Sequence, residues 1–290
     1  MKRNKIHQNT VTWNALLTSF GRSGTFELIE EAFNDMCSSF DSFPDIYTWN
    51  IILKSYGKDG RMRKMEEWYL KMQEMGASPD VVTFNTLIRV YGRNREFTKM
   101  RNVAQHMLTL YFQWNEVTFN TMIEAYGRAG MMEDMEQIHR IMKCKGVKPS
   151  PFTLTTLINA YSKEKMFDKV EKIRREWKNS DIRPDVVMYN ALLEAYRRSG
   201  NLPLLEEAFN ELETDLEPDE RSFVIIANAY RSNGLREKYK TFSTYHLILL
   251  KMPDQMCWIF PGATQNTSYL FEHEAWRGRE CPGRSRGVSS

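Results

Sequence analysis

One amide side chain recurs through the sequence at nearly constant spacing and is suited to hydrogen bonding. Asn costs roughly 0.6 kcal/mol relative to Ala inside a helix, so helix propensity does not explain its recurrence at one helical position. Because an amide both donates and accepts, it suits either a ladder of bonds to the preceding loop or neighbouring helix, or recognition of a nucleic-acid base. The residues alone leave both interpretations open. The amides are Asn14, Asn50, Asn85, Asn120 and Asn190, and Thr155 stands at the equivalent position of the fifth copy.

A cation stands eight residues after each of these positions. The whole chain is nearly balanced, with 40 Lys and Arg against 37 Asp and Glu, so any contact with a polyanion must come from local clustering. Solvated surface charge is the ordinary interpretation of such residues, whereas a line of them along one edge suits phosphate binding. The predicted phosphate-binding residues are Arg22, Lys58, Arg93, Arg128, Lys163 and Arg198.

An apolar residue stands three positions before each amide. An apolar or aromatic side chain that stacks on an unstacked base contributes roughly 1–3 kcal/mol, while contact between adjacent hairpins is the structural alternative. The predicted base-stacking residues are Val11, Tyr47, Val82, Val117, Phe152 and Val187.

These residues belong to a repeat of about 35 residues. In the first half of a copy the apolar residues fall at positions 4, 7, 8 and 11, as in Phe84, Leu87, Ile88 and Tyr91, which is the stripe of an amphipathic helix. At about 100° per residue, positions 2, 5 and 13 lie in a separate arc roughly opposite. We therefore expect these three positions to face away from the core.

The second half of a copy shows a similar stripe, as in Trp68, Tyr69 and Met72. Acidic pairs such as Glu66-Glu67 and Glu206-Glu207 suit the N-terminus of this second helix. A turn that usually contains Gly separates the halves, and a pair such as Pro79-Asp80 ends the copy. Each unit is a helical hairpin that cannot bury both stripes alone, so the sequence predicts an all-α fold, a right-handed α-solenoid.

The register gives the domain organisation. We expect 1–9 to be the remnant of an upstream repeat and 246–290 to be an irregular or disordered tail, truncated or alternatively spliced. Arg221 and Val224 make the seventh copy a degenerate one. The copies, numbered 1 to 7, span 10–45, 46–80, 81–115, 116–150, 151–185, 186–219 and 220–245.

The recurring period, the Pro-Asp boundary and segments such as Val81-Val82-Thr83-Phe84-Asn85 resemble the pentatricopeptide repeat family, from about residue 10 to 239. Copy lengths of 34 to 36 residues resemble its P class. The resemblance implies that the fifth and last residues of a copy together choose one RNA base, and that second positions of successive copies sandwich it. The implied base-reading pairs are Asn14 with Asp45, Asn50 with Asp80, Asn85 with Asn115, Asn120 with Ser150, Thr155 with Asp185, and Asn190 with Asp219.

The family's code applied to these pairs implies the target 5′-UUCCGU-3′, read with the N-terminal copy at the 5′ end. Ionised Asp only accepts hydrogen bonds, which favours the ring N–H of uracil or guanine, while Asn115 can donate to the unprotonated ring nitrogen of cytosine. Each Asp also precedes a helix and suits its N-cap, worth about 1 kcal/mol. Both roles can hold at once.

Other classes of function lack support in the sequence. No apolar run reaches the roughly 18 residues of a membrane-spanning helix. Cys37, Cys144, Cys257 and Cys281 are scattered, and Glu272-His273-Glu274 has no CxxC pair at the spacing of a zinc deaminase. We expect no catalytic residue, metal, cofactor or small-molecule substrate.

Two function classes remain. The first, which the amide and the cations favour, is a sequence-selective single-stranded RNA-binding protein of organellar RNA metabolism, acting in stability, splicing or translation, with other RNA-processing proteins as further partners. The second is a scaffold that binds a peptide in its concave groove. The resemblance implies a plant protein of the chloroplast or mitochondrion, with the chloroplast favoured, although no transit peptide is visible in this chain.

Overall fold

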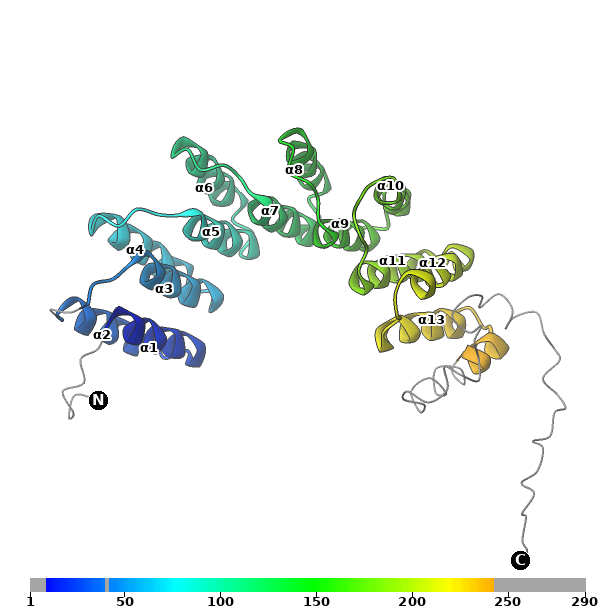
Figure 1. Ribbon diagram of the computed structural model, residues 1–290, viewed down its shortest axis with the longest axis horizontal. Coiled ribbons are helices and arrows are strands. Elements are labelled where there is room, and N and C mark those ends of the chain that lie inside the picture. The colour runs from blue at the N-terminus through cyan, green and yellow to red at the C-terminus, as the bar shows by residue number, and fades with distance from the viewer. Residues whose placement is uncertain (1–8, 40–41, 243–290) are drawn as a thin grey trace, which may run out of the picture. The chain divides into compact units, whose positions relative to one another are not determined.

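The computed structural model describes residues 9–39 and 42–242, which form helices α1 to α13 and a further helical segment at 236–242, with no strand among them (Figure 1). The predicted all-α class is confirmed. The chain divides into two compact units, Met1–Ile182 and Arg183–Ser290, each described by itself. No helix in the described part is long and apolar enough to cross a membrane. The predicted remnant through residue 8, the tail, Cys257, Cys281 and the segment 272–274 lie outside the described residues.

Helices alternate between the two halves of each copy. The first helices of the copies are α1 (Thr10–Ser23), α3 (Ile46–Lys58), α5 (Val81–Arg93), α7 (Glu116–Ala129), α9 (Pro151–Lys163), α11 (Val186–Ser199) and α13 (Glu220–Ser232). The second helices are α2 (Phe26–Cys37), α4 (Met62–Glu74), α6 (Phe97–Thr109), α8 (Met132–Cys144), α10 (Phe167–Lys178) and α12 (Leu202–Asp215).

Successive hairpins stack through their first helices. In the unit Met1–Ile182, α1 packs against α3, α3 against α5, α5 against α7 and α7 against α9; in the other unit α11 packs against α13. The apolar stripe is buried as its spacing predicts, since Phe84, Leu87 and Ile88 are at most 1% exposed. The expected α-solenoid of helical hairpins is confirmed.

A polar side chain caps the N-terminus of every first helix. It accepts a hydrogen bond from the backbone N–H three residues later, which satisfies one of the free donors of the first turn and contributes about 1 kcal/mol. The capping residues are Asn9, Asp45, Asp80, Asn115, Ser150, Asp185 and Asp219.

The expected acidic start of the second helices is wrong for α4 and α12, although α2, α8 and α10 do carry an acid in their first turn. Helix α4 begins at Met62 and α12 at Leu202, and neither has an acid in its first turn. Glu66 lies one turn further in and instead binds the next copy: its Oε1 accepts from Tyr91 Oη at 3.0 Å and pairs with Lys99 Nζ at 2.8 Å. These acids tie neighbouring copies together rather than start a helix.

Similar hydrogen bonds and ion pairs join other neighbouring copies, and in one of them the acid and the base have exchanged positions. Tyr56 Oη donates to Glu30 at 3.2 Å between copies 1 and 2, and Lys238 pairs with Glu206 at 2.7 Å between copies 6 and 7. Between copies 3 and 4 the order of charges is swapped, with Arg101 Nη1 3.6 Å from Asp134 Oδ1. Exposed pairs of this kind contribute little individually, so they act mainly on register.

Candidate nucleic-acid interface

The amide at the fifth position does not face away from the core as its helical phase suggested. Asn14, Asn50, Asn85, Asn120 and Asn190 are between 2% and 9% exposed. Each first helix packs against the first helix of the neighbouring copy as well as against its own second helix, so it buries two faces. The fifth position lies on the face between successive first helices.

Hydroxyl groups of the following copy hold these amides in place. The hydroxyl at the third position donates to the amide oxygen, Oδ1, of the preceding copy: Thr48 to Asn14 at 2.7 Å, Thr83 to Asn50 at 2.7 Å, Thr118 to Asn85 at 2.8 Å, Thr153 to Asn120 at 2.7 Å, and Ser222 to Asn190 at 2.7 Å. The structural interpretation of the recurrent amide is therefore shown. Sequence reasoning missed the hydroxyls, although Thr recurs at the third position as regularly as Asn at the fifth.

Three of the six implied base-reading pairs are joined by a hydrogen bond. The amide nitrogen, Nδ2, donates to Oδ1 of the last residue: Asn14 to Asp45 at 3.3 Å, Asn50 to Asp80 at 3.1 Å, and Asn190 to Asp219 at 2.9 Å. In each of these pairs a buried amide therefore fixes the position of a carboxylate that is exposed or half-buried. We refer to the Asn, the hydroxyl and the last residue as the amide ladder.

The other three pairs are arranged differently. Thr118 Oγ1 lies 2.8 Å from Asn85 Oδ1 and 3.0 Å from Asn115 Oδ1, so it bridges the third pair. Thr153 bridges the fourth in the same way, at 2.7 Å from Asn120 and 3.2 Å from Ser150, while Asn120 Nδ2 donates to Glu116 at 3.2 Å. Thr155 and Asp185 belong to different units; Thr155 is half-buried on α9 and Asp185 caps α11.

The terminal aspartates divide their two oxygens between two roles. In Asp45, Asp80 and Asp219, Oδ1 accepts from the capped backbone N–H and from the amide, and it lies 2.8 Å from the hydroxyl, which shares its one proton between this oxygen and the amide oxygen. Oδ2 of Asp45 and Asp219 makes no hydrogen bond with any residue in the described part of the chain, whereas the backbone N–H of Val82 also interacts with the Asp80 carboxylate. Partial burial raises the pKa of each carboxyl, but the hydrogen bonds from Thr or Ser and from Asn together lower it below its ordinary value. Each therefore offers an ionised acceptor.

Copy 3 offers a donor where these copies offer an acceptor. Asn115 Oδ1 accepts from Thr118 N at 3.0 Å, which leaves its Nδ2 without a hydrogen bond to any described residue. The side chain is exposed. The last position thus keeps its capping role when its charge is removed, while the hydrogen-bonding sense of its outer atom is reversed.

Side chains at the second position are exposed beside the amide ladder. Their exposed fractions run from 48% for Val117 to 73% for Val11, with Tyr47 at 62% and Phe152 at 55%. Val82 and Val187 are likewise exposed. Tyr47 is two residues after Asp45 in the first turn of α3, so a free carboxylate oxygen and an aromatic side chain begin the same helix. This is a surface suited to a flat, hydrogen-bonding ligand.

The six cations at the thirteenth position are exposed but not equivalent. Arg22, Lys58 and Arg93 make no ion pair with any residue that the structure describes, and Lys163 Nζ donates to the backbone oxygen of Arg128 at 3.1 Å. Arg128 pairs with Glu124 at 2.5 Å.

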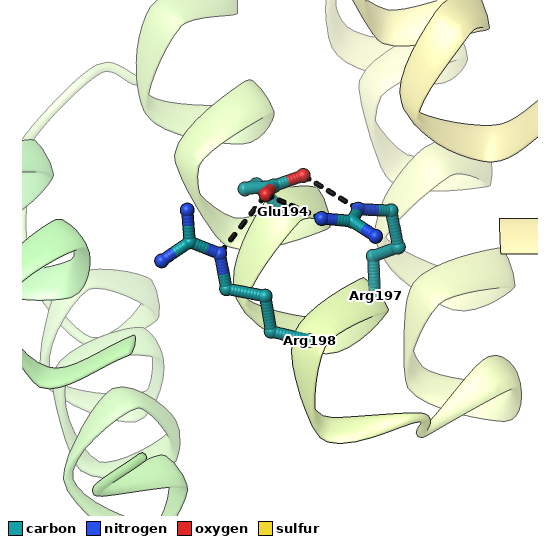
Figure 2. A network of polar contacts seen from close by, with 3 residues as sticks. All are labelled: Glu194, Arg197 and Arg198. Atoms are coloured by element: carbon teal, nitrogen blue, oxygen red, sulfur yellow. Dashed lines mark hydrogen bonds and ion pairs between the residues drawn. The ribbon is translucent and has the colours of Figure 1, made fainter. Parts of the chain in front are cut away.

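In copy 6 one carboxylate holds two guanidinium groups. Glu194 pairs with Arg198 at 2.9 Å and with Arg197 at 2.7 Å (Figure 2). The hydrogen bond from Arg197, and then that from Arg198, lower the pKa of Glu194 against the effect of its burial. The charge of Arg198 is thereby partly compensated within the protein.

Copy 7 lacks the features of the interface at its own fifth position. Val224 stands there and is 47% exposed, and Arg221 occupies the second position. Its Ser222 binds Asn190 of copy 6, whose own last residue is Asp219. Within residues 9–39 and 42–242 no group of three His, Cys, Asp or Glu is placed to hold a metal ion.

Three family models match the sequence. The PPR repeat family matches residues 44–108 and 115–163, the pentatricopeptide repeat domain matches 1–59 and 172–232, and the PPR repeat matches 152–182. Together they reach from the first residue to 232. A search of curated proteins gave no match.

Solved structures with a similar fold include the pentatricopeptide repeat protein PPR10 from maize, at 24% identity and a TM-score of 0.62, over 78% of this chain and 32% of PPR10. PPR10 in complex with an 18-nt psaJ RNA element is similar at 19% identity and a TM-score of 0.57, over 77% and 36%. The PPR domain of Arabidopsis thaliana protein-only RNase P 1 in complex with tRNA is similar at 15% identity and a TM-score of 0.50, over 62% and 95%. The chain spans about a third of the length of PPR10.

Proposed function

We propose that this chain, which belongs to the pentatricopeptide repeat family, binds single-stranded RNA along its first helices and reads one base with each of copies 1 to 6. The observation that carries the proposal is the division of the terminal aspartates. One oxygen is occupied in the amide ladder, and the other lies outside it, beside the exposed side chain of the second position.

A base would lie between the second-position side chains of successive copies, with its Watson–Crick edge toward the amide ladder. In copies 1, 2 and 6 the ionised Oδ2 of the last residue accepts from the ring N–H of uracil. In copy 3 the free Nδ2 of Asn115 donates to the unprotonated ring nitrogen of cytosine. With Ser150 favouring cytosine and Thr155 leaving room for guanine, the proposed target is 5′-UUCCGU-3′.

Preorganisation is what the amide ladder adds to this mechanism. Asn50 is held by Thr83 and Asp80 before any ligand arrives, so few rotamers remain to be frozen on binding. The RNA bound by PPR10, and the tRNA bound by the PPR domain of RNase P 1, support RNA as the class of ligand.

The proposed biological role is occlusion without catalysis. A bound segment is shielded from nucleases and held out of secondary structure, which would act on the stability, splicing or translation of an organellar transcript. We propose the chloroplast or the mitochondrion as the compartment, and other RNA-processing proteins as further partners.

Equilibrium binding of labelled RNA tests the proposal. The chain is titrated into an RNA that contains UUCCGU, a scrambled RNA of equal composition, and the DNA version, each at 50 mM and 200 mM salt. We expect the first to bind at least about tenfold more tightly than the scrambled RNA, about 1.4 kcal/mol. Absence of binding to all three would contradict the proposal and favour the peptide-binding scaffold.

A further inference from the structure

The first helices of copies 1, 2 and 3 carry positive charge only. Helices α1, α3 and α5 contain no Asp or Glu at all. They carry five cations: Arg22, Lys54, Lys58, Arg89 and Arg93. All five side chains are exposed, and none makes an ion pair with a residue in the described ranges. The nearest acid in the sequence, Asp59, is engaged by Arg61 at 2.8 Å.

Two of these cations lie at the ninth position, one turn before the predicted phosphate-binding residues. A cation in the last turn of a helix is stabilised by the helix dipole, which accounts structurally for Lys58 and Arg93. Lys54 and Arg89 lie outside the last turn, so the dipole does not account for them. They are solvated cations that no acid of the described residues neutralises, which leaves their charge available to an anionic ligand.

Close packing of the first helices gathers the five cations. A Cβ added at Gly21 would collide with Ser55, and one added at Gly57 would collide with Val90. Arg22 follows Gly21 in the sequence, and Lys54 precedes Ser55. Likewise Lys58 follows Gly57, and Arg89 precedes Val90. Two successive junctions therefore carry cations on the residues next to the contact, and a phosphate chain bound there would reduce the repulsion between these like charges.

The pattern changes at the next junction. A Cβ at Gly92 would lie 2.6 Å from that of Ala125, and the residue before Ala125 is the acid Glu124 rather than a cation. Glu124 holds Arg128, and in copy 6 Glu194 holds Arg197 and Arg198 (Figure 2). In copies 4 and 6 an acid thus occupies the ninth position where copies 2 and 3 have a cation.

We propose that Lys54 and Arg89, together with Arg22, Lys58 and Arg93, form a phosphate-binding surface on copies 1 to 3 that anchors the 5′ part of the bound RNA. The inference rests on the proposed function and deepens it. Backbone affinity is concentrated in copies 1 to 3, whereas Arg128 and Arg198 are compensated by their own acids. Five phosphate contacts give a salt slope of about −3.5, at about −0.7 for each contact with a single strand.

Two double variants of equal charge change test the surface. Lys54→Gln with Arg89→Gln removes two unpaired cations, and Arg128→Gln with Arg198→Gln removes two paired ones. Binding of an 18-nt RNA that contains UUCCGU is measured for both and for the unmodified chain between 50 mM and 200 mM salt. We expect the first variant to lose about 25-fold in affinity at 0.1 M salt and about 1.4 in slope, and the second to lose less than about threefold.

The outcomes separate the two proposals. Equal losses in the two variants would overturn the anchoring surface while leaving RNA binding intact. No binding by the unmodified chain would overturn the proposed function itself. The melting temperature of each variant without RNA is the control for folding: Lys54→Gln with Arg89→Gln should melt at or above the unmodified chain, because it relieves repulsion at both junctions. A clearly lower melting temperature for that variant would also overturn the account of these residues.

Discussion

Copies 2 and 4 share a buried frame but present different chemistry to solvent. In copy 2, Asn50 accepts from Thr83 and donates to an ionised Asp80, and the helix surface carries Lys54 and Lys58. In copy 4, Asn120 also accepts from a hydroxyl of the next copy, but its Nδ2 donates to Glu116, and Glu124 compensates Arg128. The bond from the hydroxyl to the amide is common to both. The groups that face a ligand vary independently of it.

This difference separates stability from recognition. The amide oxygen is buried and needs its hydroxyl donor whichever base is read, because an unpaired buried acceptor costs about 1–3 kcal/mol. The outer atom of the last residue is solvated and is free to change. Substitutions in the frame should therefore alter folding, and substitutions at the surface should alter binding.

Thr83→Val breaks the shared frame and should have the largest effect. It leaves Asn50 Oδ1 buried without its donor and removes the side-chain acceptor of Asp80 N, so we expect a loss of about 1–3 kcal/mol in the free energy of unfolding. Urea denaturation measures it. Thr86→Val is the matched control, since Thr86 only donates to its own helix at Val82 and should change stability by less than about 0.5 kcal/mol.

Tyr47→Ala should affect binding with little change in folding. Tyr47 is 62% exposed, and the loss of one stacking side chain should weaken RNA binding by about 1–3 kcal/mol. Fluorescence anisotropy with the UUCCGU RNA measures the loss. Tyr111→Ala removes an aromatic side chain that is 93% exposed in the turn after α6 and should leave affinity unchanged. Equal losses would show that the second position has no special role.

We also expect a residue of copy 4, without an equivalent in copy 2, to lower the stability of the fold at acidic pH. His139 and Tyr69 occupy equivalent positions of α8 and α4. Burial, and after it the charge of Lys143, lower the pKa of His139 to about 4 against the opposing effect of Glu176 and Glu136. Its Nε2 has no hydrogen-bond partner among the described residues. Below about pH 6.5 this histidine is protonated in the unfolded chain but stays neutral in the folded chain. The free energy of unfolding therefore falls as the pH drops from about 6.5 to about 4.

The expected loss at pH 5 is about 2 kcal/mol relative to pH 8. Urea denaturation at the two pH values measures it. His139→Tyr, which copies the residue of copy 2, should remove most of this dependence, whereas substitution of the exposed His106 by Gln should retain it. An unchanged pH profile in His139→Tyr would refute the assignment.

Glu124→Gln should make the first helix of copy 4 more positively charged, as the first helices of copies 2 and 3 are. Releasing Arg128 from its 2.5 Å pair is expected to strengthen RNA binding by up to about fivefold, near 1 kcal/mol, and to steepen the salt slope by up to about 0.7. Glu133→Gln on α8 makes the same change of net charge on a second helix and should have a smaller effect. If the two variants behave alike, net charge rather than local pairing controls affinity.

Much of this frame could be predicted from the sequence, because apolar spacing and the Pro-Asp boundaries report local structure directly. The exposure of Tyr47 followed from helical phase alone. The burial of Asn50 did not, because a helical wheel assumes a single core, whereas a first helix in a solenoid is buried against its neighbours too. Glu66 was misplaced because the second helix starts one turn earlier, and its partners Tyr91 and Lys99 lie in the next copy.

The amide ladder also shows why the alternatives for Asn could not be separated in the sequence. Its structural and recognition roles use different atoms of the same residues, and the division appears only once Asp80 Oδ1 is seen to make these three internal contacts. The pairing of Glu124 with Arg128, by contrast, was accessible from their spacing of four residues.

An exchange of the last residues of copies 2 and 3 tests the central claim most directly. Asp80→Asn with Asn115→Asp keeps the net charge, both caps and the buried frame, and swaps only the outer acceptor and donor. Binding of RNAs containing UUCCGU and UCUCGU, which have equal composition, is measured for the double variant and the unmodified chain. We predict that the preferred RNA changes from UUCCGU to UCUCGU, by about tenfold or more in each direction. An unchanged preference, with folding intact, would contradict base reading by the outer atom of the last residue.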